Sequence, residues 1–110
     1  MSAIISNPAR FNRRLALEAP VEMPDGAGGV TRGYEPIMSV WAEVTPLAAR
    51  GEVDAANPGA TVTHRIIIRA PREITTRHRF TDGARIYRIV SLRDSADRRL
   101  IEIHAEERVD

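Results

Sequence analysis

The chain has 110 residues, 43% of them hydrophobic, and a formal net charge of +1. This length fits one domain with a single core, and the lack of Cys excludes disulfides, a thiolate nucleophile and a cysteine zinc site. Apolar runs such as Ile66 to Ile68 are far shorter than the roughly 20 residues that span a bilayer, and the first residues lack the apolar core of a signal peptide, so we expect a soluble, cytoplasmic product with no membrane partner.

All 16 basic residues are arginine, which pairs with carboxylates and phosphates in fixed geometry, although a genome rich in G and C would also favour it. Residues 61 to 80 carry a local charge of +4, which leaves −3 for the rest of the chain. This asymmetry indicates complementary surfaces of the kind that stacked or ring-forming subunits use. The basic residues concerned are Arg65, Arg69, Arg72, Arg77 and Arg79.

The first elements expected are an arm and a strand. Met1 to Phe11 shows little periodicity, and we expect an arm that is too polar and irregular to pack on its own domain. Arg14 to Ala19 alternates apolar with polar residues, which predicts a first strand closed by Pro20. Met23 to Gly29 is rich in glycine and reads as a loop.

Two longer strands are expected on either side of a long connection. Ile37 to Leu47 alternates with apolar residues on both faces, so it is expected to be covered on more than its inner side. Ala48 to Gly59 is a twelve-residue connection, and a loop of that length is usually functional or mobile. Ala60 to Ala70 is expected to be the third strand.

Three further short strands complete the pattern. Ile74 to Phe80 is a basic strand, and Thr81 to Gly83 marks a hairpin turn into a strand over Ala84 to Leu92. A polar turn at Asp94 to Asp97 leads to the last strand, Arg99 to Glu107.

These elements predict an all-β fold, a small six-stranded antiparallel β-barrel. A long loop joins its second and third strands. Residues 1–12 would form a flexible N-terminal arm and residues 13–110 a single barrel domain. The expected core residues are Trp41, Val44, Ile66, Ile68, Tyr87, Ile89, Ile101 and Ile103.

No pattern of residues indicates catalysis. His64, His78 and His104 are far apart in the sequence and lie in expected strands that also carry arginines, which would repel a metal ion. Glu106 and Glu107 are adjacent in a strand and point to opposite faces, so they cannot act as an acid/base pair. We therefore expect no catalytic residues, no metal and no cofactor.

Nucleic-acid binding is the alternative function. A small barrel of the OB type could present its arginines to phosphates, but such barrels also use aromatic platforms. The aromatic residues here are scattered, and the net charge is far below that of a typical DNA-binding domain. The same arginines could instead form salt bridges between subunits or lie on a solvated exterior.

The order and spacing of several motifs resemble the head-tail adaptor or head-closure (stopper) proteins of siphophage-like particles. The resemblance spans about Arg10 to Glu107. The motifs are Arg13-Arg14-Leu15, Val40-Trp41-Ala42-Glu43-Val44-Thr45-Pro46-Leu47, Arg50-Gly51-Glu52, Thr63-His64-Arg65-Ile66-Ile67-Ile68-Arg69, Arg79-Phe80, Ala84-Arg85-Ile86-Tyr87-Arg88-Ile89 and a final strand ending at Glu106. The absence of lysine departs from relatives, which commonly mix both basic residues.

The resemblance implies a structural connector of a tailed particle, made in the bacterial cytoplasm and found in the virion. Such proteins form a ring that closes the DNA-filled head, and we expect a twelvefold ring in the particle and a monomer in isolation. The implied partners are copies of the chain itself, the portal or adaptor protein, the tail terminator or tail-tube protein, and the packaged double-stranded DNA in the channel. A phage, a prophage and a gene transfer agent all remain open as the source.

The resemblance also assigns roles to particular segments. It implies that the long loop faces the channel, through Arg50, Gly51, Glu52, Asp54, Asn57 and Gly59. The basic residues from Arg65 to Arg79 are expected at the interface with an adjacent copy or partner, and the arm is expected to order on the neighbouring ring.

Overall fold

The computed structural model describes residues 10–47, 52–53, 61–69, 73–95 and 99–109. Six strands close an antiparallel barrel in the order β1-β2-β5-β8-β7-β6, and β6 pairs back onto β1. The predicted six-stranded all-β barrel is therefore confirmed. The strands are β1 (Arg13–Pro24), β2 (Val30–Pro46), β3 (Glu52–Val53), β4 (Thr61–Val62), β5 (His64–Arg69), β6 (Arg79–Asp82), β7 (Arg85–Asp94) and β8 (Leu100–Val109), with β3 and β4 forming a separate small sheet.

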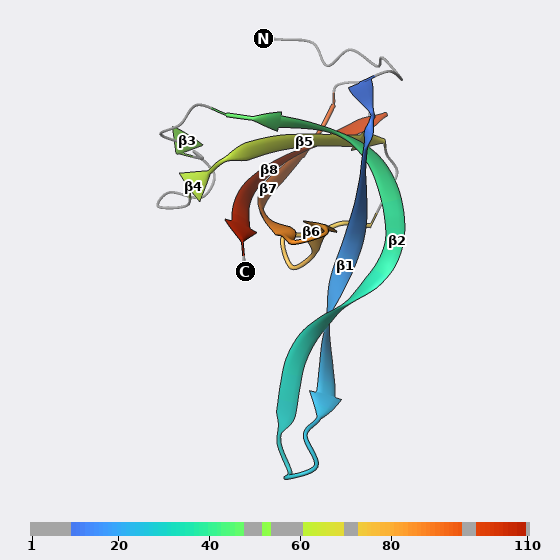
Figure 1. Cartoon of the computed structure of the whole chain (residues 1–110), viewed down its shortest axis with the longest axis vertical. Coiled ribbons are helices and arrows are strands. Elements are labelled where there is room, and N and C mark those ends of the chain that lie inside the picture. Colours follow the sequence, from blue (N-terminus) through green and yellow to red (C-terminus); the bar gives the residue numbers. More distant parts are fainter. Residues whose placement is uncertain (1–9, 48–51, 54–60, 70–72, 96–98, 110) are drawn as a thin grey trace.

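Strands β1 and β2 form one long hairpin that projects from the barrel (Figure 1). The predicted boundaries were too short, because β1 continues past Pro20 to Pro24 and β2 begins at Val30 instead of Ile37. Strand β1 pairs with β6 only from Ala16 to Glu18, so beyond that point its outer edge has no strand partner in the described part of the chain. Proline is tolerated on such an edge, since no ladder hydrogen bond is lost there.

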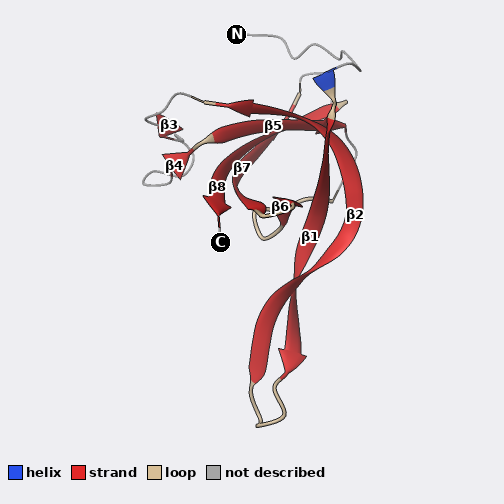
Figure 2. Ribbon diagram, viewed as in Figure 1, coloured by secondary structure: helices blue, strands red, loops and turns tan. Residues whose placement is uncertain are grey.

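A β-bulge marks the place where the hairpin leaves the barrel. Leu17 lies opposite Met38 and Glu18 lies opposite Pro36, which leaves Ile37 as an extra residue in β2. A bulge of this kind bends the strand and increases its twist. Figure 2 shows the resulting twisted ribbon running away from the barrel.

The core lies inside the barrel and follows the alternation of the strands. Leu15 lies opposite Val40, and Ile66 lies opposite Ile103, so inward residues of neighbouring strands meet in layers. The fully buried members with the largest side chains are Tyr87, Phe80, Leu15, Leu17, Ile66, Ile68, Ile89 and Ile103. Burial of these side chains is the main source of stability in a domain without disulfides.

Most of the expected core residues lie in this core, but Trp41 does not. Ile101 is buried with the others, and Val44 is half-buried and packs against the cluster. Trp41 is 54% exposed, so its assignment to the core was wrong. It lies opposite Arg14, on the outer face of the hairpin, where the guanidinium of Arg14 stacks 5.7 Å from the centre of its ring.

The end of the expected arm packs against the barrel. Phe11 is buried in a second small cluster with Ile67 and Leu100 on the outside of β5 and β8. Arg10 pairs with Glu43 at 2.8 Å. The expectation that Met1 to Phe11 cannot pack on its own barrel is therefore wrong at its last two residues, because the outward apolar residues of β5 and β8 offer them a surface. Residues 1–9 lie outside the described residues, and the arm stays a prediction for them.

Two other expected strands differ in detail. Only Arg79 and Phe80 of the expected strand Ile74 to Phe80 belong to β6. The segment before them is a turn, in which the backbone N–H of Thr75 donates to Nδ1 of His78 at 3.1 Å and the N–H of His78 donates to the Thr75 carbonyl at 3.1 Å. The expected third strand is interrupted at Thr63, whose N–H donates to the carbonyl of Ala105 at 2.9 Å.

Candidate assembly surface

The expected channel-facing residues fall largely outside the described residues. This holds for Arg50, Gly51, Asp54, Asn57 and Gly59. Glu52 is described as part of β3, where it pairs with Val62 of β4. Their role in a channel stays a prediction.

The expected interface arginines have different environments. The Nε of Arg79 binds Glu18 at 2.7 Å, and its guanidinium stacks 3.9 Å from the centre of the Tyr34 ring. Arg69 stacks over Phe11 at 5.1 Å. Arg77 is exposed, and the Nε of Arg65 is buried without a hydrogen-bond partner among the described residues. Arg72 lies outside those residues. Arg69 and Arg79 thus hold parts of their own chain together, and a role of the set at an interface stays a prediction.

Other arginines on the barrel pair with carboxylates of the same chain. Arg88 pairs with Glu106 at 3.1 Å, Arg93 with Glu102 at 3.2 Å and Arg85 with Glu107 at 3.5 Å, and Arg13 pairs with Asp82. These pairs neutralise much of the positive charge on the barrel exterior. The sequence could not show them, because the partners come from different strands.

The ionisable groups that burial perturbs belong to the fold. His64 is 8% exposed, its Nε2 lies 3.6 Å from Glu107, and burial lowers its pKa. Burial alone raises the pKa of Glu102, but hydrogen bonds from His104 and Arg93 outweigh this and the pKa lies below its ordinary value. Within the described ranges, no group of three or more metal-ligating side chains gathers.

The hairpin carries the exposed large apolar side chains of the molecule. Six such residues are found among the described residues, and all lie in β1 or β2. They are Met23 and Val30 (55% exposed each), Trp41 (54%), Ile37 (49%), Tyr34 (43%) and Met38 (42%). Soluble monomers rarely expose apolar side chains along one element in this way, and such surfaces mark protein contacts. In the sequence, the apolar residues on both faces of the expected strand Ile37 to Leu47 indicated that its outer side is a contact surface.

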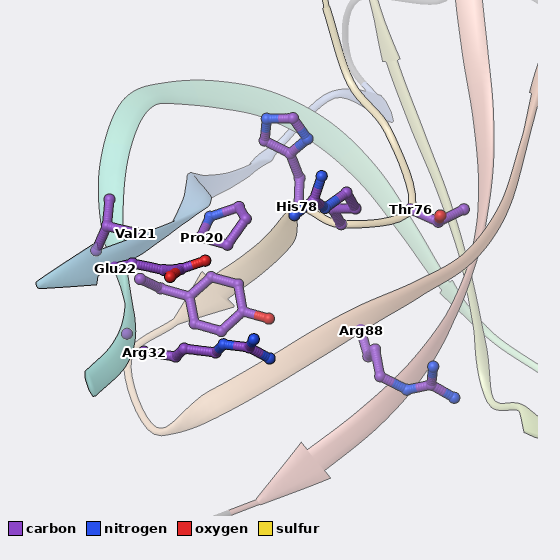
Figure 3. Close-up of a pocket in the computed structure, with 10 residues that line it drawn as sticks. Pro20, Val21, Glu22, Arg32, Thr76, His78 and Arg88 are labelled. Atoms are coloured by element: carbon purple, nitrogen blue, oxygen red, sulfur yellow. The ribbon is translucent and has the colours of Figure 1, made fainter. Parts of the chain in front are cut away.

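A cavity of about 410 Å³ lies where the hairpin meets the turn before β6. Figure 3 shows Glu22 and Arg32 reaching into it from the hairpin, with Arg88 on the opposite side. Tyr34 and Arg77 also line it. Sequence reasoning missed this site, because it joins segments that are far apart in the chain.

No helix among the described residues has the length and hydropathy needed to cross a membrane. The features of the geometry that point to function are the projecting hairpin and the cavity at its base.

Known proteins share this fold. A family model described as "Phage head completion protein" matches residues 6–108. A chain in the structure "Virion of native gene transfer agent (GTA) particle" is 33% identical, with a TM-score of 0.66, 90% of this chain covered and 96% of that chain. Protein SF1141 from Shigella flexneri 2a is 24% identical, with a TM-score of 0.70 and coverages of 92% and 96%, which shows a shared fold. No curated protein matches the chain.

Proposed function

The chain belongs to the phage head completion protein family, whose members are structural components of the virion and not enzymes, and from this we propose that copies of it form a ring in the head-tail connector. The ring would lie between the portal or adaptor protein and the tail. It would close the DNA-filled head after packaging and provide the surface on which the tail terminator or tail-tube protein docks.

The exposed apolar side chains of the β1–β2 hairpin are the observation that supports this proposal best. Tyr34, Ile37, Met38 and Trp41 are all more than 40% exposed in the single chain. Aromatic residues and Met are enriched where protein surfaces meet, and contact with neighbouring copies would remove these side chains from water. An element that projects from a closed barrel is also well placed to reach a neighbour.

The 33% identity to a chain of a gene transfer agent virion supports a tailed particle as the setting. We propose a twelvefold ring in the particle and a monomer in isolation. Double-stranded DNA would pass through the centre, and the loop from Ala48 to Gly59 would face that channel.

The alternative, a nucleic-acid-binding barrel of the OB type, has less support. Arg79, Arg85, Arg88 and Arg93 each pair with a carboxylate of the same chain, so they are not free to neutralise phosphates. The exposed Trp41 and Tyr34 are each stacked under an arginine instead of forming an open platform for bases.

Deletion of the gene in a particle-producing host tests the proposal directly. We expect filled heads that lose DNA and free tails that remain unattached, both visible by electron microscopy, and we expect restoration by the wild-type gene supplied in trans. Deletion particles with attached tails and normal DNA content would contradict the connector role.

A further inference from the structure

The two faces of the hairpin differ in charge at its base. Pairs along the ribbon alternate between faces, so Arg32 and Tyr34 lie on the face that lines the cavity, whereas Glu35 lies on the reverse face. Glu35 is exposed and forms no ion pair with any described residue. One face of the hairpin thus lines a hollow to which Arg77 and Arg88 of other segments add positive charge, and among the described residues the reverse face carries Glu35 as an unpaired carboxylate.

The cavity holds positive charge that the chain itself does not balance. Arg32 and Arg77 line it, and neither forms an ion pair within the described part of the chain. Arg88 forms an ion pair with Glu106 at 3.1 Å. Among the described residues that line the cavity, Glu22, which lies opposite Arg32 in the ribbon, is the one carboxylate against three arginines. An excess of guanidinium groups in a hollow favours a carboxylate ligand, which arginine binds with two parallel hydrogen bonds.

The charges around the cavity fit a carboxylate better than a nucleic acid. The volume of about 410 Å³ leaves ample room for a protein side chain and the residues beside it. A DNA backbone needs a row of unpaired cations on an open surface. Glu22 in the wall would also repel phosphates.

We propose that the cavity receives Glu35 of a second copy, so that the reverse face of one hairpin packs against the hollowed face of the next. This rests on the proposed ring, since contact between two different surfaces repeats from copy to copy and closes a ring when the rotation allows it. The same contact would cover Ile37, which follows Glu35 by two residues and is 49% exposed. Charge pairing and apolar burial would then act in one interface.

Disulfide cross-linking in assembled particles tests the contact. The natural chain has no Cys, so introduced cysteines meet no background. We expect the double variant Glu35→Cys with Thr76→Cys, whose second position lines the cavity, to give a ladder of covalent oligomers on a non-reducing gel. Each single variant should give dimers at most. The matched control Ser39→Cys with Thr76→Cys keeps one cysteine at the cavity and moves the other along β2, and it should give no ladder.

Charge reversal tests the same pair by a second route. Arg77→Glu and Glu35→Arg should each lower the amount of chain per particle about tenfold, equivalent to roughly 1.4 kcal/mol, and the double variant should restore it. Mass spectrometry of purified particles measures that amount, and circular dichroism verifies folding. Arg108→Glu, an exposed change in β8 away from the cavity residues, is the control and should have no effect.

The outcomes separate this inference from the proposed function. Absence of the wild-type chain from particles would overturn both. Wild-type incorporation with no ladder and no effect of either reversal would overturn the cavity contact alone. A cross-link to a different virion protein, or an effect of Arg77→Glu on DNA binding without any effect on incorporation, would also overturn the assignment to a second copy.

Discussion

Neighbouring residues of β2 show how the position of a side chain decides its role. Val40 and Ala42 point into the barrel and are buried, whereas Trp41 between them points outward and is 54% exposed. The alternation of the strand was readable from the sequence, but a tryptophan suggests burial by its size. Only the closed barrel shows that the outer face of this strand has no covering element among the described residues.

His64 makes the stability of the fold dependent on pH. Burial lowers its pKa below the ordinary 6.5, so the unfolded chain takes up the proton first. The contribution of neutral His64 to stability is fully present above about pH 6.5 and is lost as the pH falls below it. Glu102, with its lowered pKa, adds a second loss at lower pH, below the ordinary value of a glutamate.

Urea unfolding between pH 7 and pH 5 measures this effect. The variant His64→Gln should show a smaller loss of unfolding free energy over this range than the wild type, because its side chain does not take up a proton. His78→Gln serves as the control, since its imidazole lies in a more exposed turn. Equal slopes for wild type and His64→Gln would show that another group is responsible.

At the scale of elements, periodicity predicted the existence of the six barrel strands but not the reach of the hairpin. Proline usually ends a strand inside a sheet. Pro20 and Pro24 lie where the outer edge of β1 is unpaired, so β1 continues through Pro20 and reaches Pro24. The cavity and the ion pairs could not be predicted, because the register between Glu18 and Arg79 or between Arg88 and Glu106 is set only by the closed barrel. Phe11 was misassigned because its partners, Ile67 and Leu100, lie far along the chain.

Removal of the hairpin tip should leave the thermal stability of the barrel nearly unchanged. Replacing residues 22–32 with Asn-Gly removes the tip but keeps every residue of the core cluster. We expect the melting temperature to stay within a few degrees of the wild type, because the removed residues contribute no side chain to the core cluster. Incorporation into particles should be lost. A variant that joins particles normally would show that the tip has no part in assembly.

Shortening the loop between β2 and β5 should impair the particle without unfolding the barrel. We expect a variant with residues 48–59 shortened to a Gly-Ser linker to keep a folded barrel, since the described core cluster is formed by residues of the barrel strands on either side of the loop. If the loop faces the channel, the particles should contain the ring but lose DNA or fail to join tails. DNA protection from nuclease and counting of tailed particles measure this, and unchanged values for both would count against a channel role.

At the scale of the whole molecule, the chain combines a closed barrel with surfaces that have no partner in a single copy. The barrel pairs its strands from β1 round to β6, and among the described residues the unpaired strand edges lie along the projecting hairpin. The exposed side chains of the hairpin and the uneven distribution of charge are further surfaces that a neighbouring copy could cover.

The two parts of the N-terminal segment should have different roles. We expect Arg10 and Phe11 to stabilise the barrel and residues 1–9 to contact a partner protein. Deletion of residues 1–9 keeps Arg10 and Phe11 and should leave the melting temperature unchanged, while capture by the portal–adaptor complex falls. Deletion of residues 1–11 should in addition cost about 2 kcal/mol, because Phe11 is buried against Ile67. Thermal unfolding and pull-down with the purified complex measure the two effects. Normal capture after the shorter deletion would refute a docking role.

The shortest junction of the barrel is also held by ion pairs. Strands β1 and β6 pair through three residue positions only, and the same junction is spanned by Arg13 with Asp82 and by Arg79 with Glu18. Salt screens exposed charges more than it weakens apolar burial. The barrel is therefore closed along β1 and β6 in part by ion pairs. A concentrated electrolyte should separate these two strands first, while the strands on the opposite side of the barrel stay paired.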